Sequence, residues 1–418
     1  MKKVLVIGGG GREHAIVDAL SRSPKVGRIY CAPGNAGIAL QAECVPIKDT
    51  DVDSLLEFAR NEGIDLTVVG PEAALAAGVT DRFRAAGLKI FGHTAAATRI
   101  ESSKEFAKVI MARYGIPTAS YRSFTDYREA LEYVSSRPFP AVLKYDGLAA
   151  GKGVVIAGTP DEAEAALRDM LLDGSFGKGK VVVEDWLEGP EFSFMAFVDG
   201  HNVYPMPLSQ DHKRAFDGDK GPNSGGMGAY THLPFITAAD EEFALKNVLQ
   251  KAADAMVAEG CPLSGVLYGG LMKTADGIKV IEFNARFGDP ETEVVLPLLD
   301  SDIYEIFEAV ASGSSLTSGL EWSEDVTMGV VLASKGYPGH YDKGAEIVIG
   351  ADVPGCFIYH MGTASRDGRL VTSGGRVMMC VARASSIEEA HKAAYSCVDS
   401  ISCDNLFHRN DIAHWALH

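Results

Sequence analysis

The segment 280–291, VIEFNARFGDPE, holds the side chains whose types and spacing best suit chemistry on a charged substrate. Glu282 and Asn284 alternate with apolar residues as in a β-strand, so a carboxylate and a carboxamide share one face. Two such oxygen donors suit Mg²⁺, which keeps waters and substrate phosphates as its other ligands. A charged turn with Arg286 and Asp289 follows. Taken alone, a solvated strand end with a salt-bridged turn is an equal interpretation.

Lys144 is a second candidate, because it ends the otherwise apolar run 140–144. A lysine at the end of a buried strand usually extends its amine to solvent. Here a glycine-rich segment, 147–154, follows directly, and a strand lysine beside a glycine hairpin is a recurrent arrangement for covering nucleotide phosphates. The segment is not a P-loop, since Gly153 follows Lys152 where a Ser or Thr is required.

Three loops in the first hundred residues are candidates for a small-molecule site: GGGGREHA at 8–15, PGNAG at 33–37 and GPE at 70–72. Each begins at the end of an apolar strand, and in open α/β sheets ligands bind at the carboxyl ends of strands. The three loops therefore predict one shared site. The first offers backbone amides to a phosphate at a helix N-terminus, with Arg12 as counter-charge and Glu13 near a sugar hydroxyl.

A dinucleotide-binding fingerprint is the rival interpretation of the first loop, and it fails on spacing. Glu13 stands where the third glycine is required, and no acidic residue closes the second strand near residues 30–32. A nicotinamide-dependent oxidoreductase is therefore disfavoured.

The polar segment 210–228 is expected to be a long irregular loop, and such loops inside compact domains are usually functional or disordered. Its mixture of acids, bases and glycines favours a substrate loop. Within it, His212 is a candidate ligand or general base, but its charged neighbours favour an exposed charge-pair partner.

The elements that position these residues follow from periodicity. Strand–helix alternation at the N-terminus predicts strands 3–7, 28–32, 66–69 and 89–91 with helices 51–61 and 75–86. The middle of the chain predicts helix 103–114, strand 140–144, helices 160–172 and 237–259 capped by Thr159 and Thr237, strands 264–273 and 277–284, and helix 302–312. After a Ser/Gly-rich linker, strands 326–334, 343–349, 356–361 and 376–381 and helix 386–399 predict a small domain without a chemical constellation of its own.

Length and composition bound the class of protein. A chain of 418 residues with 46% hydrophobic content predicts about three globular domains. The formal charge of −17 argues against a nucleic-acid partner. Seven cysteines without paired metal spacing fit a reducing cytoplasm, and no apolar run reaches membrane-spanning length. We therefore expect a cytoplasmic protein with small-molecule partners.

Together the segments resemble the ATP-grasp superfamily and, within it, the family of phosphoribosylamine–glycine ligases, also called glycinamide ribonucleotide synthetases. The resemblance covers essentially the whole chain. It rests on GGGGREHA at 8–15, PGNAG at 33–37, GPE at 70–72, KYDGLAAGKGV at 144–154, EDWLEGPEFS at 184–193, QDHKR at 210–214, GPNSGGMGAY at 221–230 and EFNARFGDPE at 282–291.

The resemblance implies that ATP drives the ligation of glycine to 5-phosphoribosylamine. The products would be glycinamide ribonucleotide, ADP and phosphate, the intermediate glycyl phosphate, and the pathway purine biosynthesis. ATP and Mg²⁺, with Mn²⁺ as a substitute, are the implied cofactors, and a monomer or weak homo-oligomer is expected. Another ATP-grasp carboxylate–amine ligase is the alternative, and a non-catalytic nucleotide sensor is a further one.

The resemblance also implies roles for individual residues. Glu282 and Asn284 would bind the metal, and Lys144 and Arg286 would be catalytic. The implied ATP-binding residues are Lys104, Lys144, Gly151, Lys152, Gly153, Glu184, Asp185, Trp186, Leu187, Glu191 and Lys213. The implied substrate-binding residues are Gly10, Gly11, Arg12, Glu13, Asn35, Gly37, Pro71, Glu72, Asp211, Arg286, Gly288 and Asp289.

The implied fold combines α/β and α+β domains. A Rossmann-like parallel α/β domain would occupy residues 1–102, a two-lobed ATP-grasp unit would have its core at 103–120 plus 188–318 and its lid at 121–187, and a small α+β domain would occupy 319–418. One feature departs from the wider superfamily: the strand before Glu282 has no acidic residue at 268–272, which puts a second metal ion in doubt.

Overall fold

The structure is a computed structural model that describes residues 1–147, 153–174, 179–316 and 319–417. Its N-terminal part contains a parallel five-stranded sheet with the strand order β3-β2-β1-β4-β5. Its strands are β1 (Lys2–Gly8), β2 (Val26–Pro33), β3 (Glu43–Cys44), β4 (Leu66–Val69) and β5 (Ile90–Phe91). Its helices are α1 (Gly11–Ser21), η1 (Ile38–Leu40), α2 (Val52–Glu62), α3 (Glu72–Ala76) and α4 (Val79–Ala85). The predicted Rossmann-like arrangement is confirmed.

Strand β1 is apolar on both faces because helices cover both. Val4 and Val6 pack in one cluster with residues of α1 and of α12 (Ile303–Ala311), whereas Leu5 and Ile7 pack with residues of α2 and α4. The prediction of one helix over 75–86 is wrong. Gly78 adopts a left-handed φ of 81° and separates α3 from α4.

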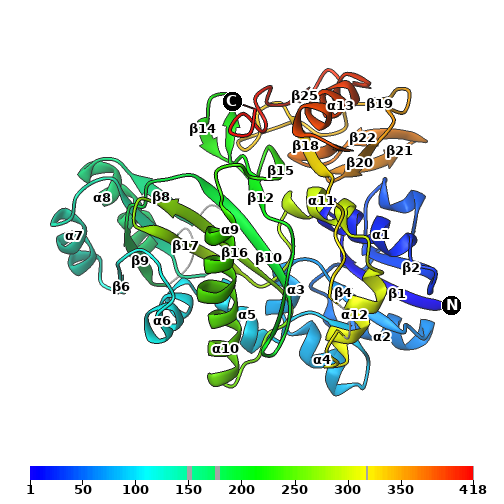
Figure 1. Cartoon of the computed structure of the whole chain (residues 1–418). Helices are drawn as coiled ribbons and strands as arrows, with labels where there is room; N and C mark the ends of the chain where they lie inside the picture. Colours follow the sequence, from blue (N-terminus) through cyan, green and yellow to red (C-terminus); the bar gives the residue numbers. More distant parts are fainter. Residues whose placement is uncertain (148–152, 175–178, 317–318, 418) are drawn as a thin grey trace.

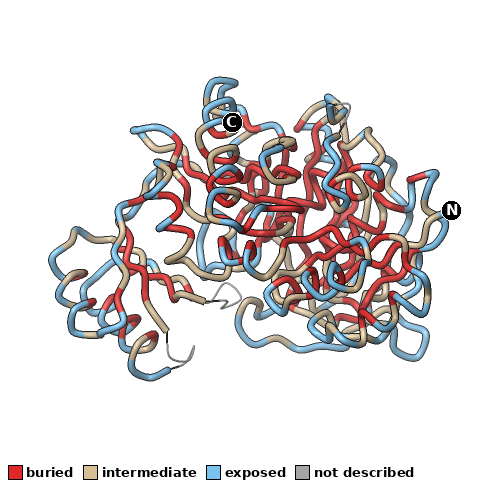
Figure 2. The backbone as a smooth tube through the Cα atoms, turned by 90° about the horizontal axis from the view of Figure 1, so that it is seen from below, coloured by how far each residue is buried: buried red, intermediate tan, exposed pale blue. Residues whose placement is uncertain are grey.

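A second sheet forms a lid that projects from the rest of the molecule (Figures 1 and 2). Its four antiparallel strands have the order β6-β9-β7-β8. They are β6 (Tyr121–Phe124), β7 (Ala141–Tyr145), β8 (Val154–Ala157) and β9 (Val181–Asp185), and they pack against α7 (Tyr127–Ser135), α8 (Pro160–Arg168) and a π-helical turn, η2 (Asp169–Asp173). Thr159 caps α8 as predicted, accepting a 3.3 Å hydrogen bond from the Glu162 amide.

The core of the molecule is a ten-stranded sheet with the order β17-β16-β10-β12-β15-β18-β23-β20, to which β11 and β25 attach at β10 and β18. Its strands are β10 (Glu191–Asp199), β11 (Asn202–Pro205), β12 (Ser209–Asp211), β15 (Gly228–Thr231), β16 (Ser264–Thr274), β17 (Gly277–Asn284), β18 (Val326–Ser334), β20 (Cys356–His360), β23 (Arg376–Ala384) and β25 (Leu406–Phe407). The smaller strands are β13 (Arg214–Phe216), β14 (Lys220–Asn223), β19 (Val348–Ile349), β21 (Thr363–Arg366), β22 (Arg369–Thr372) and β24 (Ile401–Ser402).

Helices cover this sheet on both faces. They are α5 (Ala95–Ser102), α6 (Lys104–Tyr114), α9 (Ala238–Ala244), η3 (Leu245–Leu249), α10 (Gln250–Ala258), α11 (Glu291–Val295), η4 (Leu296–Leu298), α12 and α13 (Ile387–Asp399). Phe192 and Phe194 of β10 face the cluster that contains α6 and α10, whereas Met195 and Phe197 face the cluster that contains α1 and α12. The sheet thus joins the N-terminal domain to the helices on its other side.

The core sheet continues across the Ser/Gly-rich linker into the C-terminal region. Strand β15 pairs with β18, with Ala229 opposite Gly329, so the two regions share one sheet rather than abutting as separate ones. The prediction that 210–228 is an irregular loop is wrong in part. Polar residues there form β12 and a β13–β14 hairpin, whose backbone pairing the side-chain pattern does not reveal.

Two further expectations differ from the structure. The predicted strand 343–349 is reduced to β19, and α5, capped by Thr94, was not predicted at all. Among the residues that the structure describes, no helix combines the length and apolarity needed to cross a membrane.

Candidate active site

Strand β17 carries a β-bulge at the point where the lid meets the core. Gly270 of β16 faces Glu282, while Leu271 faces Val280, so Ile281 is the extra residue. The Ile281 carbonyl accepts a 2.9 Å hydrogen bond from Nζ of Lys144, on lid strand β7. Lys144 is buried, so its amine points into the molecule instead of extending to solvent.

Glu282 lies among cations. Its Oε2 is 3.9 Å from Nζ of Lys104, at the start of α6. Burial acts to raise the pKa of Glu282, but Lys104, Lys213, Lys144 and Arg286 outweigh it and lower that pKa to about 2. The carboxylate is therefore ionised at neutral pH, and four cationic side chains from separate parts of the chain act on it.

A buried ion-pair chain fixes Lys144 from the lid side. Glu184 of β9 receives Lys144 Nζ at 2.9 Å on Oε1 and Lys108 Nζ at 2.7 Å on Oε2. Burial, together with Lys144, lowers the pKa of Lys108 to about 8. Lys108 was missed by the sequence interpretation, although its position four residues after Lys104 puts both on one side of α6.

Lys213 and Glu191 form the next part of the site. Nζ of Lys213 donates a 2.8 Å hydrogen bond to Oε2 of Glu191, at the start of β10. A small pocket lies here, bordered by these two residues and by Ser193, Asp211, Tyr268, Gly270 and Ile281 among others. The predicted ATP-binding residues Lys104, Lys144, Glu184, Glu191 and Lys213 therefore surround one region between lid and core.

A hydrogen-bonded triad supports the floor of this pocket. Oε1 of Glu291 accepts hydrogen bonds of 2.7 Å from Ser193 Oγ and 2.8 Å from Tyr268 OH. Burial and the charge of Glu291 raise the pKa of Asp211 well above its usual value, although Lys213 opposes this shift. Ser193, Tyr268 and Glu291 were not assigned from the sequence, even though Glu291 ends the EFNARFGDPE motif.

Arg286 joins the core strand to the N-terminal domain. Its Nε lies 3.4 Å from Oε2 of Glu72, and its Nη2 lies 3.2 Å from Oε1 of Glu101. The carbonyl of Phe287 accepts 3.1 Å hydrogen bonds from both Arg286 and Arg12. The Phe287 ring packs among Phe91, Phe197 and Phe307, which holds that carbonyl in place.

The loop at residues 8–15 is organised around Glu13. Its carboxylate accepts 2.6 Å hydrogen bonds from the Gly10 amide and from Nε of Arg12. A side chain at Gly70 would place its Cβ 1.9 Å from Oε1 of Glu13, and one at Gly8 would place it 2.6 Å from Glu13 Cδ. The glycines thus leave room for the carboxylate of Glu13, which caps the helix. This carboxylate accepts the hydrogen bond of the Gly10 amide, one of the amides that the sequence analysis expected to bind a phosphate.

The three N-terminal loops meet as predicted. The Gly34 amide donates to the Gly8 carbonyl at 3.0 Å, and the Gly70 amide donates to the Ile7 carbonyl at 3.0 Å. The side chain of Asn35 is used within the fold: its Nδ2 donates to the carbonyls of Gly9 and His360, and its Oδ1 accepts from the amides of Gly37 and Ile38. Asn35 therefore ties the second loop to the first and to β20.

The C-terminal region contributes to the site, contrary to the expectation that it carries no chemical constellation. Nη1 of Arg376, on β23, lies 2.8 Å from Oδ1 of Asp289 and donates to the carbonyl of Gly225 at 2.7 Å. Glu293 of α11 is fully buried beside them, and burial together with Asp289 raises its pKa well above the usual value. Arg376 was missed because its neighbours in the sequence carry no motif.

The other predicted ATP-binding residues make different contacts or lie outside the described residues. Asp185 pairs with Arg137 through 3.1 and 2.5 Å hydrogen bonds, and Trp186 is exposed. Leu187 follows it between the lid and β10. Gly151 and Lys152 lie outside the described residues, whereas Gly153 is described and directly precedes β8.

The remaining substrate-binding candidates surround Glu13, Arg286 and Asp289. Pro71 precedes α3, and a Cβ at Gly11 would meet Oε1 of Glu293 at 2.4 Å. A Cβ at Gly288 would meet Oε2 of Glu291 at 2.5 Å. A Cβ at Gly37 would meet the ring of His360, so this glycine, too, is required by close packing.

The expectation for His212 is wrong. The ring is buried, and neither ring nitrogen has a hydrogen-bond partner among the described residues. Burial, with Arg409 and His414 nearby, lowers its pKa to about 3, so the ring is neutral at pH 7. It packs against the rings of Tyr230 and His414, contacts that its charged sequence neighbours do not indicate.

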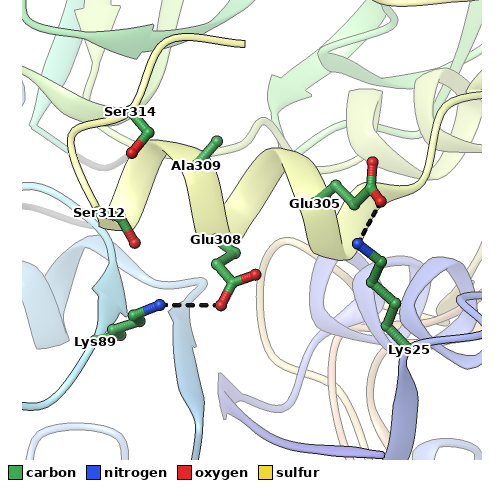
Figure 3. Close-up of a pocket in the computed structure, with 7 residues that line it drawn as sticks. All are labelled: Lys25, Lys89, Glu305, Glu308, Ala309, Ser312 and Ser314. Carbon is green, nitrogen blue, oxygen red and sulfur yellow. Dashed lines mark hydrogen bonds and ion pairs between the residues drawn. The ribbon is translucent and has the colours of Figure 1, made fainter. Parts of the chain in front are cut away.

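A second surface depression lies on α12, away from these residues (Figure 3). Its lysines are already paired: Lys89 Nζ lies 3.0 Å from Oε1 of Glu308, and Lys25 pairs with Glu305. It contains none of the residues predicted for the site.

The donor set at the end of β17 fits a magnesium ion. Glu282 and Asn284 are two residues apart on one strand, and the carboxylate is ionised. The positions opposite them on β16 are Gly270 and Tyr268, and no group of three His, Cys, Asp or Glu residues suited to a metal occurs among the described residues. This set fits an ion that takes its remaining ligands from water and phosphate.

Comparison with known sequences gives matches to three domain families of one enzyme. Residues 2–101 match the phosphoribosylglycinamide synthetase N domain, residues 102–292 its ATP-grasp (A) domain, and residues 327–415 its C domain. Phosphoribosylamine–glycine ligase of Halalkalibacterium halodurans is 50% identical over 417 residues, covering 99% of this chain and 97% of the relative. The enzyme of Caldanaerobacter subterraneus subsp. tengcongensis is 48% identical over 413 residues, covering 98% and 99%.

Solved structures give a consistent result. The crystal structure of phosphoribosylamine–glycine ligase from Thermotoga maritima aligns with a TM-score of 0.86 at 32% identity, covering 98% of this chain and 100% of that one. The biotin carboxylase domain of Hydrogenobacter thermophilus 2-oxoglutarate carboxylase, in complex with MgADP and bicarbonate, aligns with a TM-score of 0.76 at 15% identity, covering 97% and 91%. The second likeness concerns the fold alone.

Proposed function

Because the chain belongs to the phosphoribosylglycinamide synthetase family, we propose that it joins glycine to 5-phosphoribosylamine with ATP, through a glycyl phosphate intermediate. It is an ATP-dependent carbon–nitrogen ligase of purine biosynthesis, and its products are glycinamide ribonucleotide, ADP and phosphate.

The observation that carries the proposal is the meeting of lid and core at one charged region. Lys144 reaches from β7 to the carbonyl next to Glu282, and Lys104 and Lys213 add positive charge to the same place. A triphosphate needs this kind of cationic surroundings, because its charge must be neutralised before an anionic nucleophile can approach. A site spanning two sheets also suits a nucleotide held between them.

The reaction has two steps. A carboxylate oxygen of glycine attacks the γ-phosphorus of ATP, the bond from that phosphorus to the bridging oxygen breaks, and ADP leaves. The amine nitrogen of phosphoribosylamine then attacks the acyl carbon, the carbon–oxygen bond to phosphate breaks, and the nitrogen releases a proton. Both steps depend chiefly on positioning and charge neutralisation, so no dedicated base is required.

Different residues around the site would bind different parts of the substrates. Lys104 and Lys144 would contact the ATP phosphates, and Glu191 with Lys213 would hold the nucleoside side of ATP. Arg286 would bind the reacting carboxylate or the transferring phosphoryl group. Its neighbours Glu72 and Glu101 hold the guanidinium in a fixed orientation, which favours a role in positioning.

The other substrates would lie on the N-terminal side of Arg286. The three loops that meet at Gly8, Gly34 and Gly70 would take the ribose phosphate, with Arg12 as their cation. Asp211 or Asp289 would accept the glycine ammonium. Oδ1 of Asp211 has no hydrogen-bond partner among the described residues, which supports a role for a ligand donor there, whereas Oδ1 of Asp289 already lies 2.8 Å from Nη1 of Arg376.

Mg²⁺ would be held by Glu282 and Asn284, with Mn²⁺ as a substitute. When bound, the ion neutralises phosphate charge and so lowers the repulsion that the glycine carboxylate meets. The structural neighbour that binds MgADP supports this choice of metal.

A coupled assay for ADP release tests the function. We expect release to require both glycine and freshly generated phosphoribosylamine. Release that occurs with bicarbonate or formate instead of glycine would identify another ATP-grasp ligase. Release without phosphoribosylamine would contradict the proposed amine acceptor.

Three further expectations remain proposals. The domain division is 1–102, 103–120 plus 188–318, 121–187 and 319–418. The family matches, which meet at 101 and 102 and resume at 327, support its boundaries near 102 and 319. A cytoplasmic location and a monomeric or weakly homo-oligomeric state rest on sequence considerations and on the bacterial relatives.

A further inference from the structure

The C-terminal segment, residues 405–417, lies against the β13–β14 hairpin and is hydrogen-bonded to it (Figure 1). Arg409 is the largest fully buried side chain of the described residues. Its Nη1 donates to Oδ1 of Asp219, in the hairpin turn, at 2.8 Å, and to the carbonyl of Arg214, at the hairpin base, at 3.0 Å. One guanidinium therefore spans the hairpin from base to turn.

Neighbouring residues of the segment complete this contact. Asn410 donates from its amide to Oδ1 of Asp217 at 2.8 Å and from its Nδ2 to Oδ2 at 2.9 Å. The Gly218 amide donates to Oδ2 of Asp411 at 2.8 Å. All three residues of the hairpin turn, 217–219, are thus held by residues 409–411.

The hairpin begins directly after Lys213. The Lys213 carbonyl accepts hydrogen bonds from the amide and hydroxyl of Ser224, at 2.7 and 2.9 Å, so the backbone of Lys213 belongs to the hairpin base. Its side chain extends the other way, to Glu191 at the pocket lined by residues of β10, β12, β16 and β17. A shift of the hairpin would therefore move the Lys213 amine.

We propose that Arg409 is a positioning residue that acts through Asp219 and the β13–β14 hairpin to hold Lys213 at the nucleotide. This rests on the proposed function, because it takes the pocket beside Lys213 as the nucleotide site. Arg409 itself touches neither Glu191 nor Lys213 by any contact among the described residues, so its influence passes through the hairpin backbone.

The test uses Asp219→Asn in the full chain. Asp219 is exposed and has a left-handed φ of 52°, which asparagine tolerates, so the variant keeps the turn. It removes the hairpin's carboxylate from Arg409 and leaves the second partner, Asp411, in place. Glu346→Gln is the matched control, because Glu346 pairs with Arg369 in an exposed ion pair elsewhere in the C-terminal region. MgADP affinity is measured by calorimetry, and amide hydrogen exchange is measured over residues 212–224.

We expect Asp219→Asn to weaken MgADP binding about fivefold and to increase exchange in the hairpin, while the control matches wild type. In a Lys213→Met background, Asp219→Asn should weaken MgADP binding no further, because the residue through which it acts is gone. A merely structural ion pair would give additive effects.

The outcomes separate the two proposals. Wild type that binds no MgADP overturns the proposed function and this inference with it. Wild type and Asp219→Asn that bind MgADP equally overturn this inference alone. Full additivity with Lys213→Met, or equal weakening by Glu346→Gln, also overturns it.

Discussion

Nζ of Lys144, on the lid, donates a 2.9 Å hydrogen bond to the carbonyl of Ile281, on core strand β17. That carbonyl is available because the β-bulge removes Ile281 from the regular pairing with β16. The next residue is Glu282, so one irregular strand position brings the lid lysine beside the proposed metal ligand.

Lys144→Met tests this link. The variant keeps the length of the side chain but removes its charge, so we expect kcat to fall about a hundredfold or more. The fold should survive, because Glu184 keeps Lys108 as an ion-pair partner. ADP release and thermal unfolding are measured beside Lys246→Met, an exposed lysine paired within its own helix. Undiminished turnover in Lys144→Met would exclude Lys144 from the reaction.

Glu282→Gln tests the metal site. The amide retains an oxygen but loses the charge that attracts Mg²⁺, so the Mg²⁺ concentration for half-maximal activity should rise about tenfold or more. Activity is titrated with Mg²⁺ at fixed ATP for wild type, Glu282→Gln and the surface control Glu57→Gln. An unchanged Mg²⁺ requirement would remove Glu282 from the proposed ligands.

The same variant predicts a pH dependence of stability. The pKa of Glu282 falls from 4.5 to about 2 on folding, because nearby cations outweigh burial. A lowered folded-state pKa stabilises the fold above pH 4.5, and this stabilisation is lost as the pH falls towards 2. It amounts to up to about 3 kcal/mol. Urea unfolding of wild type and Glu282→Gln should therefore differ at pH 7 and converge at low pH; a constant difference would contradict the shift.

Glu72→Gln tests the N-terminal side of the site. Burial raises the pKa of Glu72, but Arg286 and Arg12 outweigh it and lower that pKa, so the carboxylate is ionised and orients Arg286. Glu72 also directly follows the Gly70 loop, one of the three proposed to take the ribose phosphate. We therefore expect KM for phosphoribosylamine to rise about tenfold while KM for ATP stays within about twofold of wild type. Steady-state kinetics with each substrate varied provide the measurement. A larger effect on ATP would place Glu72 on the nucleotide side instead.

Gly70→Ala tests whether Glu13 requires the close packing of Gly8 and Gly70 around its side chain. The added Cβ would lie 1.9 Å from Oε1 of Glu13, so the carboxylate must leave the Gly10 amide and Arg12. We expect a loss of about 2 kcal/mol in the free energy of unfolding and weaker phosphoribosylamine binding. Gly319→Ala is the control, because a Cβ there meets no atom within 4 Å. Equal free energies of unfolding for Gly70→Ala and Gly319→Ala would show that a methyl group fits beside Glu13.

Local signals in the sequence carried much of the fold. Val326–Ser334 is a mostly apolar segment in a region of turns, and β18 has those bounds. Thr159 and Thr237 cap helices because a hydroxyl and an acid three residues later satisfy the first amides locally. Loops at the ends of β1, β2 and β4 meet because parallel strands end at one edge.

What the sequence did not reveal depends on contacts between distant segments. His212 has charged neighbours in the sequence, yet the folded chain encloses its ring between Tyr230 and His414. Arg376 and Arg409 reach the central region only because β23 and the C-terminal segment pack against strands far earlier in the chain. No periodicity or motif in their own segments encodes those partners.

The continuous pairing of β15 with β18 has a consequence for biosynthesis of the chain. When the ribosome has released residues 1–292, β15 lacks a partner on one side, and its exposed edge must wait for β18 to emerge. Residues 1–292 are therefore unsuited to independent expression. A circularly permuted chain that places β18 ahead of β10 should shorten the time during which the edge of β15 is exposed.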